Sequence, residues 1–195
     1  MNIGDDRMKA SKLLKFVGVG MVFSSFLFAC SHKDSDVKTI GVLQYMEHGA
    51  LDAAYEGFIA GLAEEGYIEG ENIKIDLKNA QGDLTTAQTI ANQYVSDDVD
   101  MMFAIATQAV QSAYNATKDI PILMTAVTDP VEAGVVKDWN QSGTNVTGTS
   151  DLTPVAKQME LITELVPEAK TVGVIYTTSE VNSEVQVKMA EEAAS

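Results

Sequence analysis

The stretch Thr39-Ile40-Gly41-Val42-Leu43-Gln44 decides the fold class of this sequence. It is a compact apolar run bounded by polar residues, which is typical of a β-strand. The pattern then changes, because Leu51, Tyr55, Phe58 and Leu62 recur at the spacing of one helical face. A strand followed directly by an amphipathic helix predicts the first part of a βαβ unit.

The alternation of strand and helix continues along the chain. Residues 73–78 alternate apolar and polar side chains, as in a half-buried strand, and Asp83 is placed to cap the helix that follows. Met101–Ala106 is continuously apolar, as expected of a parallel strand buried on both faces. A helix over 108–118 and a strand over 121–127 come next. The sequence therefore predicts an α/β fold with a Rossmann-like parallel sheet.

A second unit of the same kind follows. Residues 146–149 are short and extended, and 152–166 have the apolar spacing of a helix. Thr171-Val172-Gly173-Val174-Ile175-Tyr176 then resembles the glycine-containing strand at 40–45, so we predict another strand there. Residues 185–195 predict a helix with no glycine or proline to end it. We therefore expect a second α/β lobe that is truncated, and a chain that is a fragment of a longer protein.

The N-terminus has the features of an export signal. Three lysines precede the apolar run Phe16–Ala29, and Cys30 follows that run directly. The run has about 14 residues, and a membrane-spanning helix needs roughly 20, so the alternative of an uncleaved transmembrane helix is disfavoured. Leu27-Phe28-Ala29-Cys30 resembles the lipobox of bacterial lipoproteins, which implies cleavage and acylation at Cys30. We predict a lipid-anchored protein on the extracytoplasmic side of the cell membrane.

These boundaries divide the chain into four parts. They are a lipoprotein signal peptide (1–29), a lipidated tether (30–38), a first α/β lobe (39–145), and a hinge with the beginning of an incomplete second lobe (146–195).

Composition excludes some functions. Beyond residue 29 the chain has nine basic and 26 acidic residues, a formal charge of −17, so we expect no nucleic-acid partner. Cys30 is the only cysteine, and no disulfide can form within the chain. The sequence contains no nucleophile elbow, P-loop or His-Glu-x-x-His motif. His48 has no second histidine or cysteine at ligand spacing. We therefore expect neither an enzyme nor a metal or cofactor site.

Ligands of open parallel sheets bind beyond the carboxyl ends of the strands. The polar residues that follow the predicted strands are therefore the candidate ligand-binding residues. They are Gln44, Tyr45, Glu47, Thr107, Gln108, Thr128, Asp129, Asp151, Glu180, Asn182 and Ser183. Hydroxyls and amides suit a carboxylate, and acidic side chains suit an ammonium group, so the set fits a small zwitterion.

Some of these residues have a purely structural alternative. Thr107, Asp129, Asp151 and Ser183 stand where helix N-caps are expected, and N-caps are usually structural. Tyr45 is as compatible with packing at the rim of the sheet as with contact to a ligand.

Several motifs together resemble one family of binding proteins. They include Ile40-Gly41-Val42-Leu43-Gln44, Asn79-Ala80-Gln81-Gly82-Asp83, Ala106-Thr107-Gln108-Ala109 and Thr128-Asp129-Pro130-Val131-Glu132-Ala133-Gly134. From Thr39 to Ser195 the chain resembles the substrate-binding lipoproteins of ABC importers, in the branch with tryptophan- and tyrosine-binding members. The resemblance implies a type I periplasmic-binding-protein fold, in which two Rossmann-like lobes close on a ligand. Family members continue for about a hundred residues more.

The resemblance implies that the chain binds an amino acid, with an aromatic one favoured, and delivers it to an ABC permease. Glu47 or Asp129 would hold the ammonium group. Thr107, Gln108 and Thr128 would hold the carboxylate, and the Tyr45 ring would stack on the ligand side chain. The alternatives are a surface sensor that presents the ligand to a receptor and, less favoured, an exported enzyme.

Overall fold

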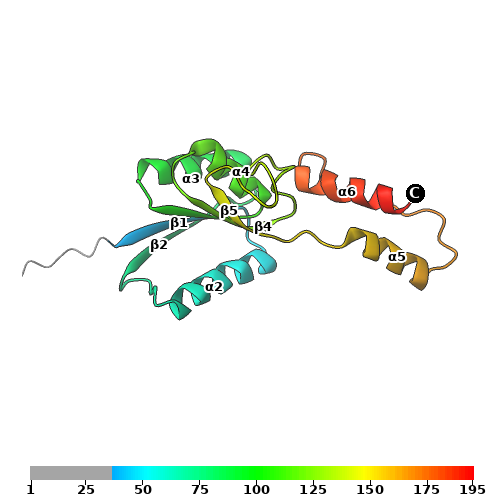
Figure 1. The fold of residues 1–195 in the computed structure, drawn as a ribbon, viewed down its shortest axis with the longest axis horizontal. Helices are drawn as coiled ribbons and strands as arrows, with labels where there is room; N and C mark the ends of the chain where they lie inside the picture. The colour runs from blue at the N-terminus through cyan, green and yellow to red at the C-terminus, as the bar shows by residue number, and fades with distance from the viewer. Residues whose placement is uncertain (1–36) are drawn as a thin grey trace, which may run out of the picture. The chain divides into compact units, whose positions relative to one another are not determined.

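A computed structural model describes residues 37–195 and shows a five-stranded parallel sheet flanked by helices (Figure 1). The predicted signal peptide, Cys30 and most of the tether lie outside the described residues. The elements are β1 (Lys38–Gln44), α2 (Gly49–Glu64), β2 (Ile73–Asn79), α3 (Leu84–Ser96), β3 (Met101–Ile105), α4 (Thr107–Ala116), β4 (Ile122–Val127), β5 (Val146–Ser150), α5 (Val155–Leu165) and α6 (Val181–Ala193).

The helices cover opposite faces of the sheet. α2 lies on one face, where Phe58 stacks on Phe103 of β3 with ring centroids 4.0 Å apart. α3 and α4 lie on the other face and form the larger hydrophobic core with Leu43 and Met102 (Figure 1). Burial on both faces explains why β1 and β3 are continuous apolar runs, and it confirms the predicted α/β class.

The strand order β2-β1-β3-β4-β5 creates a switch point between β1 and β3. β2 pairs with one side of β1. The chain then returns past β1, and β3, β4 and β5 follow in order on the other side of β1. Right-handed crossovers place the intervening helices on opposite faces, so the loops after β1 and β3 diverge. A crevice at the carboxyl ends of these two strands is the usual ligand site of such sheets.

Two predicted local signals are confirmed. Asp83 is the N-cap of α3, and its Oδ1 accepts a 2.6 Å hydrogen bond from the Thr86 backbone N–H. Gly66 follows the end of α2 with φ +85°, the left-handed conformation that glycine adopts without steric cost. These signals are local, because each depends on a few neighbouring residues in the sequence.

β5 is one of the two edge strands of the sheet and pairs with β4 in parallel. The predicted boundary between the lobes at residues 145 and 146 therefore falls just before a strand of the first sheet. The division of the chain into lobes beyond this point stays a prediction.

The predicted strand at Thr171–Tyr176 is wrong. The segment is extended but pairs with no other strand among residues 37–195. Val174 and Ile175 are 51% and 102% exposed, so neither side chain is buried as a strand inside a sheet would require. A parallel strand needs neighbours for its backbone N–H and C=O groups, and the described residues contain no second sheet to supply them.

Candidate functional site

The carboxyl ends of β3 and β4 each lead into a buried threonine. Thr107 is the first residue of α4 and is 2% exposed, and Thr128 directly follows β4 and is 7% exposed. Among the described residues, neither side-chain hydroxyl has a hydrogen-bond partner. In this part of the chain Asn145 Oδ1 is the one buried side-chain oxygen or nitrogen without a partner, so the two threonine hydroxyls reach solvent and are available to a ligand at this edge of the sheet.

The backbone is unusual immediately before this pair. Ala106 precedes Thr107 with φ +85°, and Ala126 lies two residues before Thr128 with φ +54°, next to a register irregularity between β4 and β5. Such conformations cost a residue with a side chain of the order of 1–3 kcal/mol, and they cluster at functional sites. Both unusual residues lie at the edge of the sheet where the sequence predicts the ligand.

Gln44 is buried at the end of β1, but its amide is already engaged. Nε2 donates to the Met46 backbone oxygen at 2.9 Å and to Asp52 Oδ1 at 2.7 Å. Both hydrogens of the amide nitrogen are thus used to hold the β1–α2 loop against the first turn of α2. Asp52 is not among the residues predicted from the sequence, although an acidic residue in the first turn of a helix beside a predicted site is a usable signal.

Tyr45 is fixed to the loop between β2 and α3 by two hydrogen bonds. Its hydroxyl donates to the Gly82 backbone oxygen at 2.9 Å, and the Gly82 N–H donates to the Tyr45 backbone oxygen at 2.8 Å. Burial raises the pKa of the Tyr45 phenol, and the carboxylates of Glu180 and Asp83 raise it further. The ring orientation is therefore determined before any ligand binds, in a locally negative environment.

A hydrogen-bonded chain joins the start of α4 to the start of α6. Gln108 Nε2 donates to Asn182 Oδ1 at 3.2 Å, and Asn182 Nδ2 donates to Glu180 Oε2 at 3.4 Å. These residues are 74 positions apart along the chain. The structure thus brings Gln108, Asn182, Glu180 and Tyr45 together beyond the carboxyl ends of β1 and β3.

The other predicted residues are placed differently. Glu47 is exposed, and its side chain makes no hydrogen bond or salt bridge among the described residues. Asp129 Oδ1 accepts from the backbone N–H groups of Val131 and Glu132 at 2.9 and 3.0 Å, so this carboxylate caps a turn. Asp151 is exposed, and Ser183 lies in the first turn of α6.

None of the four residues that were predicted as possible helix N-caps is one, because Asp129 caps a turn that does not continue as a helix and the other three are not at cap positions. The N-caps of α4, α5 and α6 are Ala106, Pro154 and Glu180, and none of them makes a side-chain capping bond.

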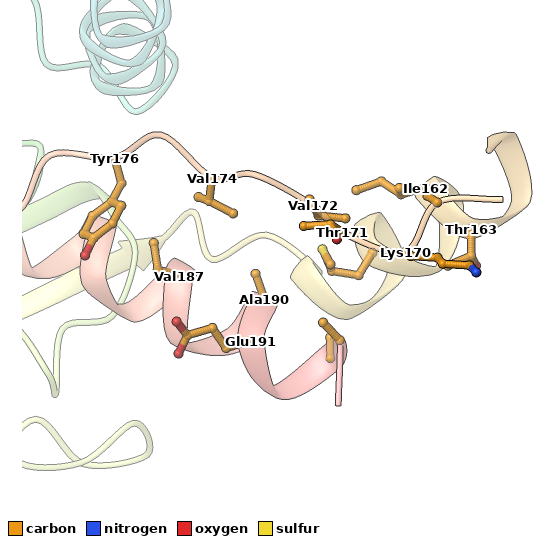
Figure 2. Close-up of a pocket in the computed structure, with 14 residues that line it drawn as sticks. Ile162, Thr163, Lys170, Thr171, Val172, Val174, Tyr176, Val187, Ala190 and Glu191 are labelled. Atoms are coloured by element: carbon orange, nitrogen blue, oxygen red, sulfur yellow. The ribbon is translucent and has the colours of Figure 1, made fainter. Parts of the chain in front are cut away.

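Three cavities lie near these elements. One of about 390 Å³ opens between the loop after β4 and α6, and of the predicted residues only Asp129 lines it. Another, of about 570 Å³, lies between α5, α6 and residues 172–177, and of the predicted residues only Ser183 lines it. The third, of about 480 Å³, lies between α5, α6 and the segment at 169–176. Figure 2 shows that Ile162, Val172, Val174, Val187 and Ala190 line this third cavity. It contains none of the predicted site residues, and we assign it to the uncovered interior of the second unit.

Within residues 37–195, no group of three acidic, histidine or cysteine side chains is arranged to hold a metal ion. In the same part of the chain, no helix combines the length and apolar character of a membrane span.

Known proteins resemble this chain in sequence and in fold. A tyrosine-binding protein from Clostridioides difficile (strain R20291) is 49% identical over 193 residues, which is 92% of this chain and 56% of that protein. A solved domain from Streptococcus pneumonia in complex with L-Trp is 45% identical with a TM-score of 0.77, over 80% of this chain and 53% of that one.

A ligand-free, open substrate-binding protein with adhesive properties from Clostridium difficile is 55% identical with a TM-score of 0.68. It matches 81% of this chain and 54% of its own, so the chain spans about half the length of these relatives. The five-stranded sheet is accordingly one lobe of a type I periplasmic-binding-protein fold, followed by the start of the next. The family model for ABC transporter substrate-binding proteins matches residues 39–195, and the chain belongs to this family.

Proposed function

We propose that the chain is part of a lipid-anchored substrate-binding protein that binds an aromatic amino acid and delivers it to an ABC permease for import. The observation that carries this proposal is the pair of threonines, Thr107 and Thr128, whose side chains are mostly buried and whose hydroxyls reach solvent without a partner in the described part of the chain. Their position at the switch-point edge of the sheet suits the carboxylate of an amino acid. Relatives that bind tyrosine and L-Trp support the ligand class.

The ligand proposal is tested by calorimetric titration of the full chain with L-tryptophan, L-tyrosine and L-leucine. Thr107→Val and Thr128→Val keep the side-chain shape and remove one donor each. A hydrogen bond to a charged group contributes about 1.5–3 kcal/mol, so we expect each variant to lose roughly 10- to 100-fold in affinity for the aromatic ligands. Thr85→Val, at an exposed position of α3, is the matched control and should bind like the wild type. Equal affinities in all four proteins would refute the assignment of the hydroxyls.

The anchor and the transport role need separate tests. Mass spectrometry of the protein extracted from its own membranes should find a mature N-terminus at Cys30 carrying acyl chains. Cys30→Ser should move the protein out of the membrane fraction, and Ser31→Ala should not. Unchanged membrane association of Cys30→Ser would exclude acylation as the anchor.

Cells that lack the protein should take up less labelled tryptophan or tyrosine. Normal uptake together with retained binding would favour the sensor alternative. Turnover of a bound ligand would favour the enzyme alternative, although the relatives named above are binding proteins.

A further inference from the structure

His48 immediately precedes α2 and is the N-cap of that helix. Its backbone is extended, with φ −161° and ψ 135°, and its carbonyl oxygen accepts from the N–H groups of Leu51 and Asp52 at 2.8 and 2.9 Å. Its side chain adds a third bond, in which Nδ1 accepts from the Ala50 backbone N–H at 3.2 Å. Only an unprotonated ring nitrogen can accept, so this bond requires the neutral imidazole with its hydrogen on Nε2.

A proton on Nδ1 would weaken this cap in two ways. The nitrogen would become a donor that faces the Ala50 N–H, and the hydrogen bond would be lost. The positive charge would also lie at the N-terminus of α2, the end at which the helix dipole is itself positive. Histidine ordinarily changes charge between pH 5 and 8, and His48 is the only histidine among residues 37–195. The start of α2 is therefore sensitive to protons near neutral pH.

The neighbouring carboxylates provide no replacement for the lost bond. Asp52, in the first turn of α2, already accepts at Oδ1 from the Gln44 side chain at 2.7 Å. Glu47 is exposed, and its side chain makes no hydrogen bond or salt bridge among the described residues. The salt bridges in the same part of the chain do not include His48.

The titratable groups with shifted pKa values on the neighbouring loops keep their charge over this pH range. Burial raises the pKa of the Tyr45 phenol above 10, and the carboxylates of Glu180 and Asp83 raise it further, so the phenol stays neutral. The hydrogen bond from Thr86 lowers the pKa of Asp83 below 3.8, so this carboxylate stays charged. A change in the order of the α2 start between pH 7.5 and 5 would thus point to His48.

The first turn of α2 is connected to the candidate site through Gln44. Asp52 holds one hydrogen of the Gln44 amide, and the Met46 backbone oxygen accepts the other at 2.9 Å. Gln44 ends β1, at the switch point where a ligand is expected. Helix ends open at a small cost in free energy, so loss of the cap would release Asp52 in a fraction of the molecules. Binding would then have to restore the order of this loop, which lowers the apparent affinity.

We propose that His48 is a proton-sensitive cap of α2, through which ligand affinity falls as the pH decreases from 7.5 to 5. This role rests on the proposed function, because it regulates binding at that same site in a protein exposed to the pH outside the cell. The stabilisation is present while His48 is neutral, and it is lost as the pH falls through the range in which histidine takes up a proton.

Titration of the full chain with L-tryptophan at pH 7.5 and pH 5 tests the regulation of binding. We expect the wild type to bind roughly two- to tenfold more weakly at pH 5, as the usual strength of an N-cap allows. His48→Asn should bind equally well at both pH values, because an asparagine oxygen caps a helix and takes up no proton in this range. His48→Ala has no cap and should show the weaker affinity at both.

Glu47→Gln is the matched control, since it removes a charge from the exposed residue next to His48 and leaves the cap in place. It should keep the pH dependence of the wild type.

Amide hydrogen exchange of the ligand-free protein tests the cap without reference to binding. Comparison of the wild type with His48→Asn at one pH removes the intrinsic effect of pH on exchange. The amides of Ala50, Leu51 and Asp52 should exchange at similar rates in the two proteins at pH 7.5. At pH 5 they should exchange about threefold or more faster in the wild type, because only the wild type loses its cap.

The possible failures are distinct. If neither the wild type nor His48→Asn binds L-tryptophan or L-tyrosine at pH 7.5, the proposed function fails, and the regulation of binding fails with it. If the wild type binds with the same affinity at both pH values, only the role of His48 is refuted. The same conclusion follows if His48→Asn loses as much affinity at pH 5 as the wild type, or if the two proteins exchange alike at pH 5.

Discussion

Two glycine-containing segments of similar sequence have different structures in this molecule: one is a buried strand and the other pairs with no strand among the described residues. Ile40-Gly41-Val42-Leu43 forms the centre of β1, where Val42 and Leu43 are 0% exposed. Val172-Gly173-Val174-Ile175 is extended but unpaired, and Ile175 is completely exposed. An apolar pattern therefore favours a strand, but the strand forms only where neighbouring strands are present to pair with it.

The largest expected contrast between the segments is in amide hydrogen exchange. The amides of Val42 and Leu43 belong to ladders on both sides of β1 and should exchange only on global unfolding. Those of Val174 and Ile175 have no ladder partner and should exchange at least about a thousandfold faster. Equal protection, measured by mass spectrometry, would show that the second segment finds partner strands in solution.

Truncation of one apolar side chain in each segment should change the free energy of unfolding by very different amounts. Leu43→Ala opens a cavity in the core and should lower the free energy of unfolding by about 2–5 kcal/mol. Ile175→Ala removes a side chain that is already in water and should change it by less than about 0.5 kcal/mol. Urea unfolding followed by circular dichroism measures both. A loss of similar size in the two variants would contradict the exposure of Ile175.

The two glycines provide a sharper comparison. A Cβ added to Gly41 would lie 2.8 Å from Cγ of the buried Tyr94 ring, so Gly41→Ala should destabilise the protein by about 1–3 kcal/mol. No atom lies within 4 Å of the corresponding position at Gly173, and Gly173→Ala should cause no loss. The double variant of Gly41→Ala with Tyr94→Leu should recover part of the loss through relief of the clash. An undiminished loss would assign the effect to the backbone of β1.

The smallest expected effect concerns the N-caps of α3 in the first unit and α6 in the second, which differ in their hydrogen bonds. Asp83 caps α3 through its bond to Thr86, whereas Glu180 at the N-cap of α6 makes no side-chain capping bond. Asp83→Ala should therefore lower the melting temperature slightly at neutral pH, and Glu180→Ala should leave it unchanged.

The capping bond lowers the pKa of Asp83 below its ordinary value of 3.8. Its stabilisation is therefore present above pH 3.8 and disappears as the pH falls through the lower, folded-state pKa. Thermal scans of the wild type and Asp83→Ala should converge at acid pH. A difference that persists at the lowest pH would mean that the carboxylate charge does not matter.

The candidate site was predictable only in its location. The rule that ligands bind beyond the carboxyl ends of parallel strands directed attention to Thr107 and Thr128, and both are buried there. The rule could not show that Gln44 is occupied by Asp52, because that bond depends on how α2 folds back over β1. It also could not rank the carboxylates, since exposure and hydrogen bonding separate Glu180 from Glu47.

The succession of strands and helices along the first lobe, the cap at Asp83 and the left-handed turn at Gly66 could all be predicted from the amino-acid sequence. These features depend on side-chain periodicity and on contacts within one or two turns of the chain. Only the tertiary structure decided that 171–176 stays unpaired and that Glu180 approaches Gln108 and Tyr45. Both outcomes depend on groups that are distant in sequence, because strand pairing and the electrostatics of a cleft arise when separate elements meet.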